Sequence, residues 1–367
     1  MNLMSSGKPR YKGDSSMEFN IRPLVLPDDY EGIAAVWNEE LAEPTTAESL
    51  EEADSKLYEH GHLYVNEDGL LEGYDRFRRA AVDEDGRIVG YLWTWRAPWT
   101  EAGGLYHTLV VSKAFRGRGV GQALLAEAAA WASSIGAGQI YTEVWDDDLR
   151  SLRFAEQSGF GIERRSWQSV LELKQAEEAA FHADLSVIER LESEGIRFVS
   201  LAAMPEEERE QLLYELESPT FKDIPGFLGT PPGFGDWQKW YLRGDGYAPE
   251  RVLLALDGDR YVGACSLRYF EETRGMYHEY TCVHRDYRGR GIALALKLLS
   301  IRLAQRTGAL YLRTDNDSLN EPMLAVNRKL GYRSLRGKYR IKGDVGGIAA
   351  ANGKLDSADR DAEISKL

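Results

Sequence analysis

Two segments of the chain alternate between apolar and polar residues and carry an Asp-Gly pair near their centre. The first is Ala81–Trp93, AVDEDGRIVGYLW, and the second is Leu253–Leu267, LLALDGDRYVGACSL. Runs rich in β-branched and aromatic residues favour strands, and an Asp-Gly pair between two such runs favours a tight turn. Each segment is therefore predicted to form a β-hairpin.

The two hairpins occupy the same place in a series of elements that the chain contains twice. Each copy begins with a strand and an amphipathic helix, at Ile21–Glu40 and at Ile196–Glu217, where Asp28 and Pro205 are expected to start the helices. After the hairpin, each copy continues with a strand, a glycine-rich loop, a long helix, a strand, a helix and a final strand. This order predicts an α/β fold in which a mixed central β-sheet is flanked by helices.

Landmark residues of the two copies are separated by nearly constant distances along the chain. The offset is 173 residues at the hairpin glycines and 172 residues at two later landmarks, the pairs being Gly90 and Gly263, Arg116 and Arg288, and Gly159 and Gly331. Three landmarks at one spacing indicate a duplicated domain. We expect domains at 19–173 and 196–342, a helical linker at 174–195, a disordered extension at 1–18 and a flexible tail at 343–367.

Composition and charge narrow the class of protein further. The 367 residues are enough for two domains, and 43 % apolar and 28 % charged residues are ordinary for a globular chain. The net charge of −14 argues against nonspecific binding of nucleic acid, and no apolar stretch is long enough for a membrane span. The two cysteines, Cys265 and Cys282, lie in strand-like runs, which favours reduced thiols and a cytoplasmic protein.

An arginine- and glycine-rich loop precedes the long helix in each copy. The first loop reads RGRGVG and the second RGRGIA, and their residues are Arg116, Gly117, Arg118, Gly119, Val120 and Gly121, and Arg288, Gly289, Arg290, Gly291, Ile292 and Ala293. Glycine permits left-handed backbone, while the N–H groups at a helix N-terminus and nearby guanidinium groups attract anions. We expect each loop to bind a phosphate or a pyrophosphate.

Other kinds of glycine-rich loop fit these residues less well. A P-loop ends in Gly-Lys-Ser or Gly-Lys-Thr and a dinucleotide fingerprint reads G-x-G-x-x-G, and neither occurs in the two loops. Arginine- and glycine-rich tails that bind RNA are disordered, whereas these loops lie within structured patterns. The remaining alternative is a tight turn with solvent-facing arginines, which the repetition in matched context disfavours.

The two loops resemble the acetyl-CoA pyrophosphate loop of the GNAT superfamily of N-acetyltransferases, which reads Q/R-x-x-G-x-G/A. The order of elements and the Gly-Phe or Gly-Tyr pair after the last helix extend the resemblance over about 19–173 and 196–341. It implies two tandem GNAT domains with acetyl-CoA as co-substrate, its pyrophosphate on the loop amides and its pantetheine along the preceding strand. The strand residues expected to contact it are Leu109, Val110 and Val111, and Thr281, Cys282 and Val283.

The resemblance also suggests groups that transfer protons when an amine attacks the thioester. Glu279 lies on the strand before the second loop, where many GNAT enzymes place a general-base glutamate, although a solvated or ion-paired glutamate is the alternative. Strand alternation would put Glu279 on the face of Thr281 and Val283. His107 takes the matching position in the first copy, nine residues before Arg116, and would be either a base or a hydrogen-bonded structural histidine.

Both copies depart from the family at the group that protonates the thiolate. The usual tyrosine, four residues before the glycine that follows the last helix, is replaced by Ala155 in the first copy and Asn327 in the second. Tyr280 and Tyr332 are weaker candidates for this acid. Asn320 matches a later CoA-contacting asparagine of the family, and we assign Asn320 and Asn327 to CoA binding. We favour the second copy as catalytic and the first as degenerate or structural.

The activity expected from the resemblance is transfer of an acetyl group from acetyl-CoA to a primary amine of a small molecule, with no covalent enzyme intermediate. The aromatic segments 222–242 and 93–100 would contact the amine or pack into the core. The alternatives are a non-catalytic acyl-CoA-binding or sensing protein and a protein or peptide N-acetyltransferase. We expect no metal site. The identity of the acceptor and the oligomeric state are not specified by the sequence.

Overall fold

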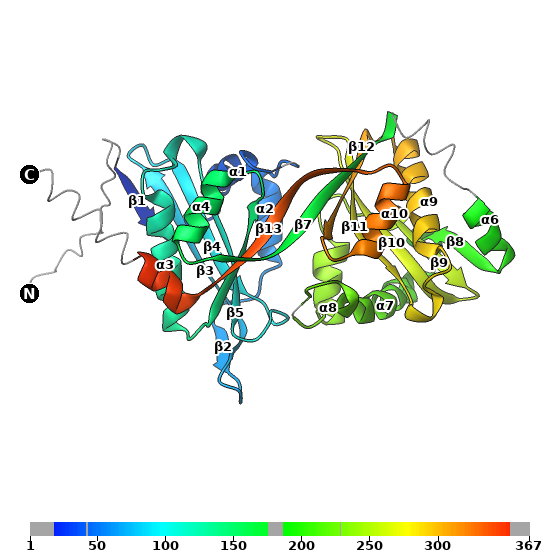
Figure 1. Cartoon of the computed structure of the whole chain (residues 1–367), viewed down its shortest axis with the longest axis horizontal. Helices are drawn as coiled ribbons and strands as arrows, with labels where there is room; N and C mark the ends of the chain where they lie inside the picture. The colour runs from blue at the N-terminus through cyan, green and yellow to red at the C-terminus, as the bar shows by residue number, and fades with distance from the viewer. Residues whose placement is uncertain (1–17, 42, 175–185, 228, 353–367) are drawn as a thin grey trace, which may run out of the picture. The chain divides into compact units, whose positions relative to one another are not determined.

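The computed structural model describes residues 18–41, 43–174, 186–227 and 229–352 (Figure 1). The disordered extension expected at the N-terminus lies almost wholly outside these residues, as do much of the expected linker and the end of the expected tail. Within the described ranges, no helix is long and apolar enough to cross a membrane.

The chain divides into two compact units, and neither unit is continuous in sequence. The first unit consists of Met1–Val144, Asp148–Glu163 and Arg340–Leu367, and the second of Trp145–Asp147 and Arg164–Tyr339. The units follow the two sequence copies except at the final strand of each copy. These strands are divided between the units, so each unit contains residues from both copies.

The first unit is built on a mixed sheet in the order β1-β3-β4-β5-β6-β13, with β2 paired to β3. Neighbouring strands are antiparallel except β5 and β6, which run parallel on either side of the crossover helix α3. A short 3₁₀ helix at Lys113–Phe115 precedes the first loop. The other elements are β1 (Phe19–Arg22), α1 (Tyr30–Asn38), α2 (Ala47–Ser55), β2 (His62–Val65), β3 (Leu71–Asp83), β4 (Ile88–Arg96), β5 (Gly104–Val111), α3 (Val120–Ser134), β6 (Gln139–Trp145) and α4 (Leu149–Gln157).

The second unit repeats this plan with the order β7-β12-β11-β10-β9-β8 and one additional helix, α6, before its first strand. Short helical turns lie at Leu201–Ala203, Ser218–Asp223, Gln238–Leu242, Pro249–Arg251 and Arg285–Tyr287. The other elements are β7 (Gly161–Glu172), α6 (Ser186–Ser193), β8 (Ile196–Ser200), α7 (Glu206–Glu217), α8 (Phe234–Trp237), β9 (Val252–Asp257), β10 (Arg260–Phe270), β11 (Gly275–Val283), α9 (Ile292–Thr307), β12 (Tyr311–Asp317), α10 (Glu321–Lys329) and β13 (Arg333–Asp344).

Both hairpins predicted from the Asp-Gly pairs are present, as β3–β4 and β9–β10. Their turns contain Gly86 and Gly258, each with a positive φ that only glycine adopts without strain. The expected start of the first helix at Asp28 is wrong by one residue. Asp29 precedes α1 instead, and its carboxylate accepts hydrogen bonds from the Val25 N–H and the Arg22 guanidinium rather than capping the helix.

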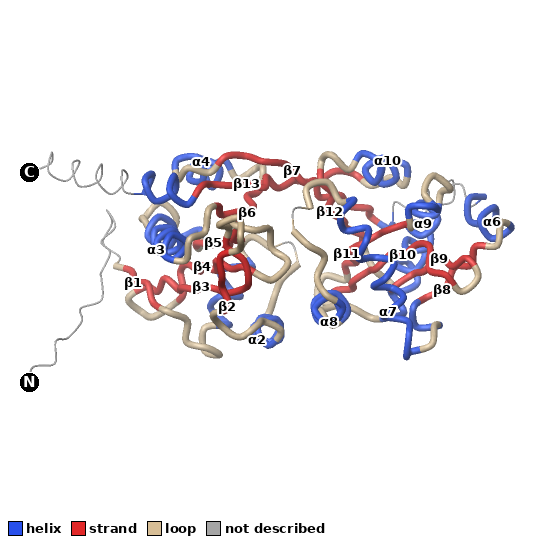
Figure 2. The backbone as a smooth tube through the Cα atoms, turned by 90° about the horizontal axis from the view of Figure 1, so that it is seen from below, coloured by secondary structure: helices blue, strands red, loops and turns tan. Residues whose placement is uncertain are grey.

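Helices cover both faces of each sheet (Figure 2). In the first unit, Leu124 and Ala128 of α3 pack on Leu92 and Val111, while α1 lies on the opposite face. In the second unit, α9 and α6 share one apolar core with Leu312 of β12. The helices α7 and α8 pack on the other face with Leu254 and Cys282. The strand after each hairpin therefore lies between two layers of helices.

The last strands of the two copies complete different units. Residues Ser166–Glu172 of β7 pair with Asp317–Tyr311 of β12 in the second unit. The end of β13 belongs to the first unit, where the Val345 N–H donates to the Gly138 carbonyl. Residues 345–352, expected within a flexible tail, are helical with Ile348 fully buried, so that expectation is wrong for the described part of the tail.

Candidate functional site

The first loop forms a sharp turn between β5 and α3. Gly117 and Gly119 have φ values of 77° and 80°, and the helix begins at Val120. The first bond of the helix joins the Ala123 N–H to the Gly119 carbonyl, so the preceding N–H groups have no acceptor within the helix. A side chain at Gly119 would have no atom within 4 Å. The loop therefore presents backbone donors beside open space, as an anion site requires.

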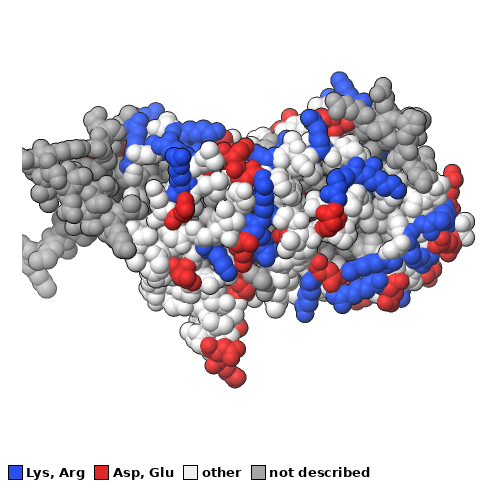
Figure 3. Space-filling view, in the orientation of Figure 1, with Lys and Arg blue, Asp and Glu red and all other residues white. Residues whose placement is uncertain are grey.

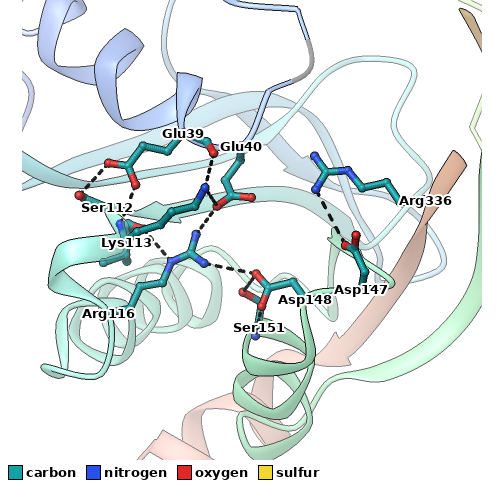
Figure 4. Close-up of polar contacts among 10 residues, drawn as sticks. Glu39, Glu40, Ser112, Lys113, Arg116, Asp147, Asp148, Ser151 and Arg336 are labelled. Carbon is teal, nitrogen blue, oxygen red and sulfur yellow. Dashed lines mark hydrogen bonds and ion pairs between the residues drawn. The ribbon is translucent and has the colours of Figure 1, made fainter.

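Arg116 anchors this loop through acidic residues (Figure 4). Its guanidinium donates to the Val111 carbonyl at 3.0 Å and to Glu40 at 2.8 Å, and it pairs with Asp148 at 3.4 Å. Asp148 also caps α4 by accepting the Ser151 N–H at 3.0 Å. Arg116 therefore connects α1, the loop and α4, with its charge offset by two carboxylates.

Glu39, at the end of α1, holds the other side of the loop. Its carboxylate accepts hydrogen bonds from the Ser112 hydroxyl at 2.8 Å and the Lys113 N–H at 2.7 Å. The Lys113 ammonium donates to the Glu39 carbonyl at 2.6 Å (Figure 4). These contacts fix the approach of the chain to the glycines.

Two other arginines bring positive charge to the first loop. The Arg150 guanidinium, from the first turn of α4, lies against Gly117, and the Arg118 guanidinium lies 5.3 Å from the centre of the Phe115 ring. Within the described part of the chain, neither forms an ion pair with a carboxylate. They are the cations best placed to meet a bound phosphate. Arg150 was missed in the sequence because the loop pattern ends before α4.

The second loop has the same backbone but a different charge balance. Gly289 and Gly291 have φ values of 76° and 91°, and α9 starts directly afterwards. Asp223 pairs with Arg288 at 2.5 Å and with Arg285 at 2.6 Å, and this pairing lowers the pKa of the Asp223 carboxyl. Both cations on this side of the loop are therefore neutralised.

The remaining arginine of the second loop is paired by α6. Arg290 contacts Glu194 at 2.7 Å, and Arg190 donates to the Arg290 carbonyl at 2.5 Å. Val187 lies so close to Gly291 that an added Cβ would approach it to 2.9 Å. By contrast, a side chain at Gly289 would have no atom within 4 Å. The second loop is therefore supported on one side and open at Gly289.

The strand before each loop separates from its parallel neighbour. Pairing of β5 with β6 ends at Tyr106 and Tyr141, and pairing of β11 with β12 ends at Tyr277 and Arg313. The predicted contact residues 109–111 and 281–283 follow these last pairs. The geometry thus leaves a splay beside the strand residues assigned to acetyl-CoA.

One extra residue distinguishes the second of these strands. In the first unit, Gly90 pairs with Val111 and Thr94 with His107, in regular register. In the second unit, Gly263 pairs with Val283 and Leu267 with His278, because the register shifts between Ser266 and Leu267. The second strand is one residue longer between equivalent pairs, which is a β-bulge at Glu279.

The bulge changes two expectations about Glu279. The structural counterpart of His107 is His278, so the match of His107 to Glu279 by counting residues is wrong. The expected face is also wrong, because Thr281 contacts Cys265 on the α9 side whereas Glu279 pairs with Arg268 at 2.8 Å. Arg268 in turn donates to the Trp240 carbonyl on the α7 side of the sheet. The bulge therefore aims the carboxylate at the α7 face.

A second carboxyl lies near Glu279 on this face. Glu217, the last residue of α7, is 2 % exposed and accepts a 3.0 Å hydrogen bond from the Trp237 indole. Burial raises the pKa of Glu217 to about 8, and the charge of Glu279 adds to the shift. Sequence reasoning missed Glu217, although it falls four residues after the buried Leu213 on the apolar stripe of the helix.

A model of the acetyltransferase (GNAT) family matches residues 35–160 and 210–332, once in each copy. Together the two matches cover more than half of the chain. The chain belongs to this family. Two GNAT repeats confirm the tandem organisation that the loops suggested, and membership places the protein among the acyltransferases.

Solved structures show the same fold over most of the chain. The tandem GNAT protein from the clavulanic acid biosynthesis pathway matches with a TM-score of 0.65 and 17 % identity, covering 89 % of this chain and 98 % of that one. A GCN5-related N-acetyltransferase from Sphaerobacter thermophilus matches with a TM-score of 0.61 and 21 % identity, covering 89 % and 96 %. These likenesses confirm the mixed α/β GNAT fold.

A relative in sequence covers a smaller region. N-alpha-acetyltransferase 30 of Schizosaccharomyces pombe is 31 % identical over 96 residues, which is 25 % of this chain. The match spans 63 % of the length of that relative. It supports the family and leaves the acceptor of this protein open.

The other groups predicted to transfer protons in the GNAT domains are buried and hydrogen-bonded. His107 shares a 2.8 Å hydrogen bond with Thr94, and burial lowers its pKa to about 4, so the imidazole is neutral at neutral pH. The Tyr280 hydroxyl lies 2.8 Å from that of Thr220, and burial raises the pKa of Tyr280. Burial likewise raises the pKa of Tyr332, whose hydroxyl bonds His278 at 2.8 Å. Both phenols hold their protons tightly, which makes them poor acids.

The two asparagines assigned to CoA differ in their surroundings. Asn320 precedes α10 at the surface, and its side chain does not cap the helix. Asn327 is 2 % exposed, and its amide joins Asn316 of β12 at 2.7 Å and Lys297 of α9 at 2.9 Å. Lys297 was missed in the sequence, although it is the one charged residue in the apolar run of IALALKLLSI.

The surface and the metal search add little to the site. Figure 3 shows acidic and basic side chains interspersed over the face in view, with an acidic tip on the hairpin of β2 and β3, where Glu67 and Asp68 are exposed. Across the described residues, no group of three or more His, Cys, Asp or Glu side chains could hold a metal ion.

Proposed function

We propose that the protein transfers an acetyl group from acetyl-CoA to a primary amine of a small molecule, with the second unit as the site of the chemistry. The bulge at Glu279 carries the proposal, because it turns a carboxylate toward the α7 face beside the splay of β11 and β12. Acetyl-CoA supplies the activated thioester. The loop amides would hold its pyrophosphate, and the strand residues 281–283 would align its pantetheine.

Glu279 would take the proton of the attacking amine. Its side chain is about one quarter exposed, so an amine can approach it from solvent. The Arg268 guanidinium keeps the carboxylate ionised and oriented. The aromatic side chains of Tyr241 and Phe221 belong to the same α7-side core and would meet the acceptor. The first unit would keep a second acetyl-CoA site, because its loop has unpaired arginines but no equivalent of Glu279.

Substitution in one loop at a time tests the two cofactor sites. Glu at Gly119 or Gly289 places a carboxylate where the structure has open space, so each change opposes the anion without a clash. The matched controls are Gly86→Glu and Gly258→Glu, in hairpin turns with the same left-handed backbone and the same open surroundings. Titration calorimetry of acetyl-CoA should find one site lost in each loop variant and none in the controls.

Turnover then separates the roles of the units. Release of thiol from acetyl-CoA should require a small amine, and Gly289→Glu should abolish it while Gly119→Glu should not. Binding that survives both loop variants would refute the assignment of the loops. Binding without thiol release from any amine would favour an acyl-CoA-binding protein.

A peptide acceptor is the second candidate. The observation in its favour is the 31 % identity to an N-alpha-acetyltransferase over 96 residues. An amine panel that includes short peptides with free N-termini distinguishes the two. Faster thiol release with peptides than with small amines would replace the small-molecule proposal.

A further inference from the structure

The core of the second unit contains a buried ammonium group. Lys297 lies in the second turn of α9 and is 1 % exposed. Within the described residues its Nζ makes one hydrogen bond, to the Asn327 side chain at 2.9 Å, and no ion pair with a carboxylate. The Nζ also lies 5.3 Å from the centre of the Tyr332 ring. A buried charge with so few partners is unfavourable unless it serves a purpose.

The first unit shows that the fold does not need this charge. At the same offset of 172 residues, Leu125 replaces Lys297 and Ala155 replaces Asn327. Both side chains are buried, and they fill the same positions with apolar atoms. The polar pair is therefore a feature of the second unit alone, which also carries the bulge and Glu279.

The pair lies beside the splay of the second unit. Asn327 projects from α10 to Asn316 of β12, three residues beyond the last pair between β11 and β12 at Arg313. Lys297 reaches the same amide from α9. Asn327 stands where GNAT enzymes place the tyrosine that protonates the thiolate. The ammonium is thus one hydrogen bond from the position of the missing acid.

The neighbouring titratable groups leave the proton on Lys297. On β10 and β11, Cys265 and His278 are buried and lie 3.4 Å apart (Sγ to Nδ1). Burial raises the pKa of Cys265, and burial and the charge of Lys297 lower the pKa of His278. Burial raises the pKa of Tyr332. All three are neutral near pH 7, and Ser300 and the two asparagines do not titrate.

The acidity of Lys297 suits proton transfer to a thiolate. Burial lowers the pKa of its ammonium from the usual range to about 8. A free thiol has a pKa of about 8.5. Transfer between groups of similar pKa is close to balanced, which favours general acid catalysis near neutral pH.

We infer that Lys297 gives a proton to the sulfur of coenzyme A as the thioester breaks, with Asn327 positioning the ammonium. This rests on the proposed acetyl transfer in the second unit. The C–S bond of acetyl-CoA breaks, the amine nitrogen forms the new C–N bond, and Glu279 accepts the amine proton. An N–H bond of Lys297 breaks as the S–H bond forms. Solvent then returns a proton to Lys297 and removes one from Glu279.

Product binding tests the inference without turnover. In a Gly119→Glu background, which restricts binding to the second unit, coenzyme A is titrated with base and the ultraviolet absorbance of its thiolate is followed. An ammonium at the sulfur should lower the pKa of the bound thiol below that of the free thiol. Lys297→Met removes the charge at similar length and should abolish this shift. A bound thiol with an unshifted pKa in the Lys297 protein would overturn the inference.

Turnover gives a second readout. Lys297→Met should lower kcat about 10²-fold or more while changing the Kd of acetyl-CoA less than threefold. It should also lose the fall in kcat above pH 8 that deprotonation of Lys297 causes. Leu125→Met, the matched position in the first unit, should change neither quantity. A normal kcat and pH profile in Lys297→Met would reduce Lys297 to a structural role and refute the inference.

The remaining outcomes separate the inference from the proposed function. A lowered thiol pKa without turnover of any amine would refute acetyl transfer and retain the contact between Lys297 and sulfur. Selective loss of succinyl-CoA binding in Lys297→Met would show that the ammonium reads an acyl carboxylate, which overturns the proton transfer. Circular dichroism of Lys297→Met and Lys297→Leu confirms folding, since the first unit has leucine at this position.

Discussion

The two arginine–glycine loops share one backbone and differ in what surrounds their charges. Two arginines beside the first loop, Arg118 and Arg150, form no ion pair among the described residues. Those of the second loop are matched by Asp223 and Glu194. The second unit instead carries carboxylates and an ammonium beside its splay. The difference teaches that duplication has separated anion binding from proton transfer, with the first unit better at holding a phosphate and the second better equipped for chemistry.

The largest expected effect follows from the bulge. Glu279→Gln removes the proposed base at constant size, and kcat should fall on the order of 10²–10⁴-fold with little change in the Kd of acetyl-CoA. Thiol release under saturating amine measures it. Glu271→Gln, an exposed substitution in the same unit, is the control. Loss of activity in Gly119→Glu with a normal Glu279→Gln would reverse the roles of the units.

The next effect concerns the helix at residues 345–352. Ile348 is fully buried in the first unit, so Ile348→Ala should lower the free energy of unfolding by about 2–5 kcal/mol. Urea denaturation followed by fluorescence measures it. Leu319→Ala, at a position 72 % exposed, should change stability by less than about 0.5 kcal/mol. Equal stability of the two variants would mean that this helix adds nothing to the first unit.

A pH-dependent effect should distinguish Glu217 from exposed glutamates. Burial raises its pKa to about 8 in the folded protein, while an unfolded glutamate titrates near 4.3. Between these values the folded state binds the extra proton, so the Glu217 contribution to stability falls as pH rises, by up to about 1.4 kcal/mol per unit, and levels off above pH 8.

Glu217→Gln should remove that slope, because glutamine keeps an acceptor for Trp237 and does not titrate. Unfolding free energies at several pH values between 5 and 9 measure it. Glu207→Gln, at an exposed position of the same helix, should keep the slope of the wild type. Parallel pH profiles for wild type and Glu217→Gln would show that Glu217 is ionised in the folded protein.

The smallest effect compares the loop anchors. Arg116→Ala leaves Glu40 and Asp148 unneutralised beside the first anion site, and should weaken acetyl-CoA binding there about tenfold, or 1.4 kcal/mol. Arg288→Ala should weaken the second site less than threefold, because Arg285 still neutralises Asp223. Calorimetry in backgrounds that retain one loop measures both. Equal losses would show that the charge balance of the loops does not matter.

Local pattern was sufficient for the hairpins, the loops and the repeat. Each is carried by neighbouring residues, such as the Asp-Gly turns and the glycines with positive φ. The GNAT resemblance then led correctly to the family and the fold.

The bulge could not be predicted, because one inserted residue in a strand leaves both hydrophobic periodicity and nearby landmarks intact. It changed the partner of His107 and the face of Glu279. The buried polar groups Glu217 and Lys297 were missed for a related reason. Helical pattern identifies the buried stripe, but only packing shows that a charged residue on that stripe stays inside. The division of the last strands was hidden as well, since a strand pattern does not name the sheet that it joins.

The shared last strands have a consequence for how such a gene can change. The first unit takes residues 340–352 from the end of the chain, and the second takes most of β7 from the middle. A deletion of either half would remove an edge from the surviving sheet. Selection could therefore release the first copy from catalysis without releasing it from the gene, and its retained loop would persist as raw material for a new ligand.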